Sequence, residues 1–149
     1  MKIESDPPEC VFCVVGAGSS STPIVWASPS AVAFFPLRPA ALGHTLVIPV
    51  KHIDDLWALN PADAQPLMEL VLSTAQAIRR SLMPDGLNLI VSAGAAATQT
   101  VPHLHFHLVP RWHGDSFGRI WPTPSPPAPT SRTVRKTAHR IRAAMPSPR

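Results

Sequence analysis

The chain has 149 residues, of which 45% are hydrophobic and 15% are charged, and this is enough for one domain with a hydrophobic core. Its net charge is +4, but residues 1–120 hold seven Lys/Arg against nine Asp/Glu, whereas residues 121–149 hold six Lys/Arg and no acid. The body therefore lacks the basic surface of a dedicated nucleic-acid binder. No apolar run approaches the roughly 18 residues of a membrane span, and the start "MKIESDPPEC" does not resemble a signal peptide, which indicates the cytoplasm.

The first half of the chain predicts three strands. Apolar runs at residues 23–28 and 31–37 lie on either side of a Pro-Ser pair, which favours a turn. A third apolar run follows at residues 44–50.

Residues 59–83 predict one long helix. Asn60 is a favourable N-cap, and Pro61 suits the first helical position, where its missing amide hydrogen is not needed. Pro66 removes one intrahelical hydrogen bond and predicts a kink or a later start. The apolar stripe of the helix comprises Leu67, Leu70, Val71, Thr74 and Ile78.

Two further strands follow this helix. The first is predicted at residues 87–93, and a loop at 94–102 leads to the second, "VPHLHFHLVPR" at 101–111. Because side chains alternate between the faces of a strand, three histidines share one face, and three apolar residues share the other. A helix would scatter the imidazoles around its axis. The two sets are His103, His105 and His107, and Leu104, Phe106 and Leu108.

The order of these elements predicts an α+β fold. Strands, one long helix and more strands favour a mostly antiparallel five-stranded sheet with the helix across one face. Residues 1–120 would form this domain, and "WPTPSPPAPTS" begins a Pro-rich linker and a basic tail at residues 121–149. A short helix is predicted in the tail, with a disordered tail as the alternative. Its apolar residues at helical spacing are Val134, Ala138, Ile141 and Met145.

The clustered imidazoles can shuttle protons, act as nucleophiles or bind a metal. Cys10 and Cys13 form a C-x-x-C pair, which in a cytoplasmic protein indicates half of a metal site or a redox pair, with two unligated thiols as a third possibility. A closed tetrahedral zinc site needs two more ligands. His52 and His103 are candidates, although their spacing alone does not select them.

Two segments resemble the histidine triad (HIT) family of nucleotide hydrolases and transferases. They are "GHTLVIPVKH" at residues 43–52 and "QTVPHLHFHLVPR" at 99–111, in which "HLHFHLV" meets the family signature His-φ-His-φ-His-φ-φ, with φ apolar, at every position. The resemblance runs from about residue 9 to 112. It implies a compact α+β domain, a homodimer, and a purine nucleotide or nucleotide conjugate as the ligand.

The resemblance also implies the roles of individual residues. His105, the middle histidine, would attack an α-phosphate and form a nucleotidyl-histidine intermediate that water hydrolyses. His107 and His44 would support the phosphoryl oxygens or the leaving group. Gln99 and Thr100 lie in the loop that would supply further donors to the phosphate.

Zinc-carrying relatives bind the metal through the C-x-x-C pair, the histidine after "IP" and the first histidine of the triad. In this chain the corresponding ligands are Cys10, Cys13, His52 and His103. Such a zinc would be structural, because four protein ligands leave no position for a reacting water.

Three positions differ from the family pattern, and they leave the nucleoside preference open. Pro36 stands where many members carry an acid or Asn that contacts the ribose, and Ser92 stands where many place Asn or Gln near the phosphates. Thr98 replaces a common glycine, and its β-branched side chain disfavours a positive φ. Ser92 can still donate to a phosphate, and Leu37 is a candidate for the base pocket.

The same fold could serve other functions. One alternative is a diadenosine polyphosphate hydrolase, and a second is a nucleotide-binding regulatory protein with reduced catalysis. Specialised nucleotidyl transfer in a biosynthetic pathway is a third.

Overall fold

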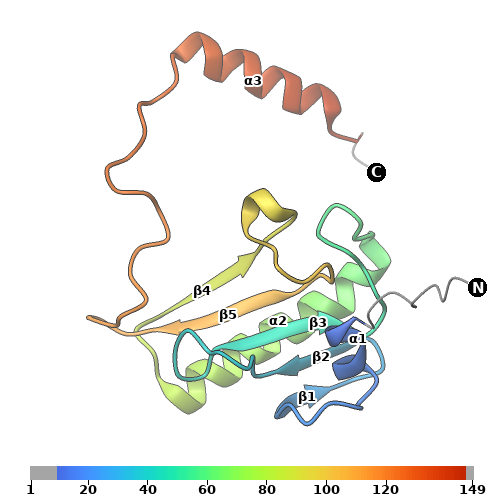
Figure 1. Ribbon diagram of the computed structural model, residues 1–149. Helices are drawn as coiled ribbons and strands as arrows, with labels where there is room; N and C mark the ends of the chain where they lie inside the picture. Colours follow the sequence, from blue (N-terminus) through green and yellow to red (C-terminus); the bar gives the residue numbers. More distant parts are fainter. Residues whose placement is uncertain (1–9, 147–149) are drawn as a thin grey trace, which may run out of the picture. The chain divides into compact units, whose positions relative to one another are not determined.

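The computed structural model describes residues 10–146 and contains one antiparallel five-stranded sheet. The strand order is β1-β2-β3-β5-β4, so β1 and β4 form the two edges (Figure 1). The predicted α+β fold is therefore confirmed, and each predicted strand lies within about three residues of its expected place, except at the start of β5. The strands are β1 (Ile24–Ala27), β2 (Ala31–Phe34), β3 (Thr45–Pro49), β4 (Gly86–Val91) and β5 (Phe106–Arg111).

The long helix α2 (Pro61–Leu82) begins where the sequence predicts. The Asn60 side chain accepts a hydrogen bond from the amide of Asp63 at 2.9 Å, which caps the first turn. The helix runs through Pro66, so the alternative of a later start is wrong. All the residues of the predicted apolar stripe are buried. Burial of one helix face explains the spacing of about 3.6 residues in the sequence. The buried residues are Leu67, Leu70, Val71, Thr74 and Ile78.

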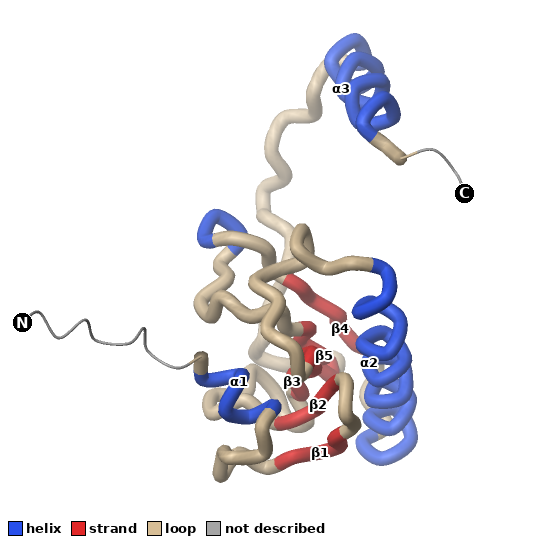
Figure 2. The backbone as a smooth tube through the Cα atoms, turned by 90° about the vertical axis from the view of Figure 1, so that its right-hand side faces the viewer, coloured by secondary structure: helices blue, strands red, loops and turns tan. Residues whose placement is uncertain are grey.

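Helices cover both faces of the sheet (Figure 2). On one face α2 packs against β2, β3 and β5, and the core there includes Leu104, Phe106 and Leu108. On the other face lies the short helix α1 (Val11–Gly16), with Val15 packed in a second core cluster that contains Phe34. The sequence did not predict α1, because six residues are too few to show a period.

The histidine segment differs from its prediction in one respect. The expected strand begins at residue 101, but β5 begins only at Phe106, so His103 and His105 precede it. Their segment bends at residues 101–103, and the amide of Leu104 donates to the carbonyl of Ile53 at 2.6 Å instead of to a neighbouring strand. The predicted alternation holds, since the apolar residues lie in the α2 core and His103 and His105 contact the ring of Phe12 from α1.

Contacts within the chain divide it between Phe117 and Gly118, close to the boundary at residue 120 that the sequence predicts. The second unit contains α3 (Ser131–Ala144), whose N-cap is Thr130. All the described residues of α3 are exposed. Within residues 10–146, no helix has both the length and the apolar character required to cross a membrane.

Candidate active site and metal site

Four predicted ligands meet beside α1. Cys10 is the N-cap of this helix and Cys13 lies in its first turn, while His52 follows β3 and His103 precedes β5. Their ligand atoms all lie within 4.8 Å of one another. The structure therefore joins three segments that are far apart in the sequence into one cluster, and neither cysteine forms a disulfide.

The distances in this cluster fit a tetrahedral metal site. The Sγ atom of Cys13 lies 3.3 Å from Nδ1 of His52 and 3.6 Å from Nδ1 of His103, and Sγ of Cys10 lies 3.4 Å from Nδ1 of His103. Zn–S and Zn–N bonds of ordinary length at tetrahedral angles separate S and N by about 3.6 Å. The observed spacing leaves room for one ion of that size between the four ligand atoms.

Hydrogen bonds orient both imidazoles for metal binding. Nε2 of His52 donates to Oδ1 of Asp54 at 2.9 Å, and Nε2 of His103 donates to the carbonyl of Pro49 at 2.9 Å. Each Nδ1 lone pair therefore faces the thiols, as a metal ligand requires. Burial lowers the pKa of His103 and so favours the neutral imidazole that can coordinate.

The hydrogen bonds of the middle histidine of the triad fix which ring nitrogen carries its lone pair. Nδ1 of His105 donates to the carbonyl of His103 at 2.7 Å, so Nε2 carries no proton in the neutral ring. His105 is a buried side chain, 5% exposed, and no hydrogen bond of the described residues uses its Nε2. Phe12 contacts the ring with centroids 5.2 Å apart and holds its orientation.

His44 and His107 form a second ordered pair. The amide of Ala40 donates to Nδ1 of His44 at 3.0 Å, which leaves the His44 proton on Nε2. That nitrogen lies 3.0 Å from Nδ1 of His107 and donates to it. The proton of His107 is then on Nε2, and its ring lies beside His105 with centroids 4.9 Å apart. The result is a nucleophilic nitrogen next to an N–H donor, which is the pairing that attack on a phosphate needs.

The 94–100 loop, which precedes the triad, is shaped by the side chain of Gln99. Its Nε2 donates to the carbonyls of Asp54 at 2.7 Å and Val101 at 3.0 Å, and its Oε1 accepts from the amide of Gly94 at 2.8 Å. Both amide hydrogens are used, and only acceptor capacity remains. Gln99 therefore positions this loop in the structure and offers no free donor to a phosphate.

Thr98 adopts the positive φ that its side chain disfavours. The loop contains one 3-10 turn, η1 (Ala95–Ala97), and Thr98 follows it at φ 68°. The left-handed backbone conformation of this threonine costs about 1 kcal/mol.

The other predicted substrate residues differ in their exposure. Thr100 is exposed and Ser92, just after β4, is half-buried. Leu37 is 91% exposed in the segment between β2 and His44. Pro36 beside it is half-buried.

A HIT domain profile matches residues 18–114, which is more than half of the chain. The chain belongs to the HIT family. This confirms the resemblance read from the triad, and it places the protein in a family of nucleotide-binding hydrolases and transferases.

Three solved structures of HIT proteins resemble this one. A HIT family member from Bacillus subtilis has a TM-score of 0.85 and 31% identity, covering 94% of this chain and 99% of its own. A zinc-bound histidine triad protein from Mycobacterium smegmatis has a TM-score of 0.69 and 31% identity, covering 92% and 98%. A hypothetical histidine triad nucleotide-binding protein from Sulfolobus tokodaii has a TM-score of 0.68 and 28% identity, covering 89% and 88%.

Three residues of this HIT site were missed by the sequence interpretation. They are Phe12, which contacts two histidines, Ala40, whose amide fixes the tautomer of His44, and Asp54, which accepts from His52. Asp54 had a usable signal, since an acid two residues after a histidine ligand often orients that ligand. The amide of Ala40 had none, because any residue provides it.

The buried histidine pair predicts an acid-sensitive fold. Burial, with neighbouring His105 and His44, lowers the pKa of His107 to about 4. As the pH falls below about 6.5, the unfolded histidine binds a proton before the folded one does, so stability is full above 6.5 and declines toward pH 4. Between pH 7.5 and 5, the wild type should lose about 2 kcal/mol more free energy of unfolding than His107→Gln. Urea unfolding of both proteins at both pH values measures this difference, and equal losses would contradict it.

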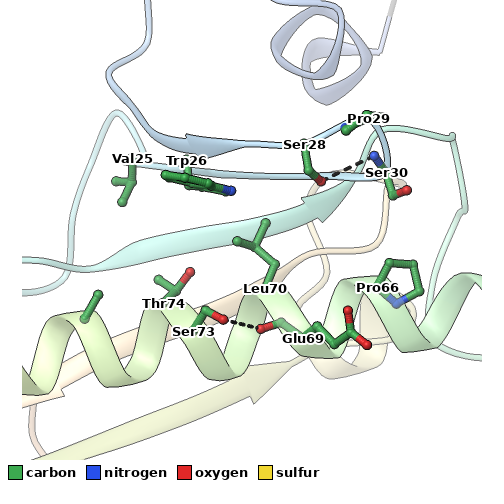
Figure 3. Close-up of a pocket in the computed structure, with 11 residues that line it drawn as sticks. Val25, Trp26, Ser28, Pro29, Ser30, Pro66, Glu69, Leu70, Ser73 and Thr74 are labelled. Atoms are coloured by element: carbon green, nitrogen blue, oxygen red, sulfur yellow. Dashed lines mark hydrogen bonds between the residues drawn. The ribbon is translucent and has the colours of Figure 1, made fainter.

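A separate groove of about 600 Å³ lies between β1 and α2, away from the histidines. Trp26 projects from the strand side and Leu70 from the helix side (Figure 3). Glu69 is the only ionisable residue lining it, and it has neither histidine nor cysteine. The residues that line this groove include none of the imidazoles or thiols of the candidate site.

Proposed function

We propose that this HIT protein is a nucleotide hydrolase that acts through a covalent intermediate on His105. The observation that carries the proposal is the Nε2 lone pair of His105, which is fixed by the bond from Nδ1 to the carbonyl of His103 and is used by no hydrogen bond of the described residues. The Sulfolobus neighbour that is named as nucleotide-binding supports a nucleotide as the ligand.

The reaction would run in two displacements. Nε2 of His105 attacks the α-phosphorus of a nucleoside phosphoramidate, the P–N bond breaks, and the leaving nitrogen takes a proton delivered through the His107–His44 pair. The Nε2–H of His107, supported by His44, would donate to a phosphoryl oxygen or to the leaving group, since its ring lies beside that of His105. Water then attacks phosphorus and the P–Nε2 bond breaks. One proton of the water returns to the His107–His44 pair, and a nucleoside monophosphate and neutral His105 remain.

We assign zinc to Cys10, Cys13, His52 and His103. Two thiolates and two neutral imidazoles are a closed tetrahedral set that suits this ion, and the zinc-bound neighbour from Mycobacterium smegmatis supports the choice. When bound, the metal would fasten α1 to the segments that carry His52 and His103, without an open position for water.

We also propose a homodimer that pairs through β4. Both β1 and β4 are sheet edges. A register shift between Ile24 and Trp26 interrupts β1, and such an irregularity disfavours pairing of that edge with another strand. β4 pairs with β5 without a shift over six residues and exposes Leu87 and Leu89. A long regular edge with exposed leucines favours pairing with a second copy.

The substitution Leu89→Lys should convert this dimer to a monomer, because a charged side chain would then face the new interface. Sedimentation velocity of both proteins at equal concentration measures the mass. Leu72→Lys, which alters an exposed leucine on α2, is the matched control and should remain dimeric. A dimeric Leu89→Lys, or a monomeric wild type, would refute pairing through β4.

A substrate comparison tests the proposed activity. The full-length protein is given an adenosine phosphoramidate and a diadenosine polyphosphate in parallel, and quenched samples are searched by mass spectrometry for a nucleotidyl adduct on His105. Faster cleavage of the phosphoramidate with the adduct supports the proposal. Faster cleavage of the dinucleotide favours the diadenosine polyphosphate hydrolase, and nucleotide binding without turnover favours the regulatory alternative.

A further inference from the structure

A chain of hydrogen bonds joins the metal site to the 94–100 loop. Nε2 of His52, whose Nδ1 faces the thiols, donates to the carboxylate of Asp54 at 2.9 Å. The backbone carbonyl of the same Asp54 accepts from Nε2 of Gln99 at 2.7 Å. Oε1 of Gln99 then accepts from the amide of Gly94 at 2.8 Å, at the start of the loop. Asp54 is thus bonded to the metal site through its side chain and to the loop through its backbone.

The second histidine ligand is joined to the same glutamine. Nε2 of Gln99 also donates to the carbonyl of Val101 at 3.0 Å, and this carbonyl accepts from the amide of His103 at 2.8 Å. The amide of Leu104 donates to the carbonyl of Ile53, so the two ligand-bearing segments are also bonded directly. Gln99 therefore lies where the two histidine segments and the loop meet.

Among the described residues, the hydrogen bonds that attach the loop to the rest of the domain come from the side chain of Gln99. The internal bonds of the loop form one exposed turn, in which the amides of Ala97 and Gln99 donate to the carbonyl of Gly94. Thr98 stays at positive φ, which costs energy that the surroundings must offset. A loop of this kind samples open states readily unless an attachment outside it holds it in place.

We propose that Gln99 is a positioning residue that couples occupancy of the metal site to the order of the 94–100 loop. A metal bound by His52 and His103 fixes the segments that carry the carbonyls of Asp54 and Val101, and these carbonyls seat the Gln99 amide. Its Oε1 then holds the amide of Gly94. The inference rests on the metal assignment made above, and it gives that metal a second effect, on the loop beside the nucleophile.

Hydrogen exchange with and without zinc tests the coupling. In the full-length wild type, zinc should slow exchange of the loop amides by at least about tenfold compared with the chelated protein. In Gln99→Leu, zinc should bind with an affinity within about threefold of the wild type, since Gln99 contacts no ligand side chain, but it should no longer protect the loop. A glutamine with a purely structural role would change loop exchange equally with and without the metal.

A second variant tests the metal-site end of the chain of hydrogen bonds, and a third serves as a control. Asp54→Ala removes the carboxylate but keeps the carbonyl, so zinc affinity should fall about tenfold while saturating zinc still protects the loop. Gln76→Leu, on the exposed side of α2, is the matched control and should behave as the wild type. Loop exchange in the wild type that does not respond to zinc, or zinc-dependent protection that persists in Gln99→Leu, would overturn the coupling. A wild type that binds no zinc would also overturn the coupling. That result would not contradict the proposed reaction at His105, because the experiment does not measure turnover.

Discussion

Replacement of His105 by glutamine is expected to lower the turnover of an adenosine phosphoramidate by at least about 10³-fold, because the attacking nitrogen is removed and the neighbouring donors cannot replace it. The fold should survive, since Phe12 and the α2 core do not depend on the lone pair. Initial rates at saturating substrate measure the loss, and circular dichroism with thermal unfolding checks the fold. Zinc content should be unchanged, because His105 is outside the ligand set.

His113→Gln is the matched control for this substitution. His113 is exposed and its side chain lies outside both histidine clusters, so its replacement should leave turnover unchanged. If His105→Gln keeps turnover within about tenfold of the wild type, the covalent role is wrong, since loss of a nucleophile costs far more than this. The chemistry would then have to be direct attack by water.

The double variant Cys10→Ser/Cys13→Ser is expected to lose the metal altogether. Elemental analysis should find about one zinc per chain in the wild type and none in the variant, because serine hydroxyls replace both thiolates. With free zinc about 1,000-fold above its Kd, the wild type should exceed the variant by about 4 kcal/mol in free energy of unfolding. Denaturant unfolding of both proteins, with zinc and with a chelator, measures this difference in free energy of unfolding.

Chelation provides the internal control for that measurement. Without zinc, the two proteins should differ by much less in their free energy of unfolding, because the thiols then contribute little beyond packing. A fully folded wild type that contains no metal after purification and gains no stability from added zinc would defeat the assignment.

Most of the sheet and α2 could be predicted because each has a regular period. The stripe along α2 and the cap at Asn60 were both visible, and both are present. The start of β5 could not be predicted, because Leu104 bonds to Ile53, a partner that no local pattern reveals. The same limit hid α1, which depends on packing of Phe12 and Val15 against a distant strand.

The site was predictable in its residue types but not in its protonation. The alternating pattern indicated that His103, His105 and His107 would share a face. The tautomers of His103, His105 and His44 depend on backbone atoms, and for His103 and His44 these atoms are the carbonyl of Pro49 and the amide of Ala40. Because any residue supplies the same backbone carbonyl, the sequence does not reveal such a contact. The structure was therefore needed to show which nitrogen is nucleophilic.

The wide separation of the four ligands affects how the protein is made. Cys10 and Cys13 leave the ribosome about 90 residues before His103, and α1 is too short to persist alone. During translation both thiols are therefore without His103 until most of the domain has been synthesised. In that period they are accessible to oxidants and to other metals. Cells short of zinc should accordingly accumulate newly made chains with a protease-sensitive N-terminal segment.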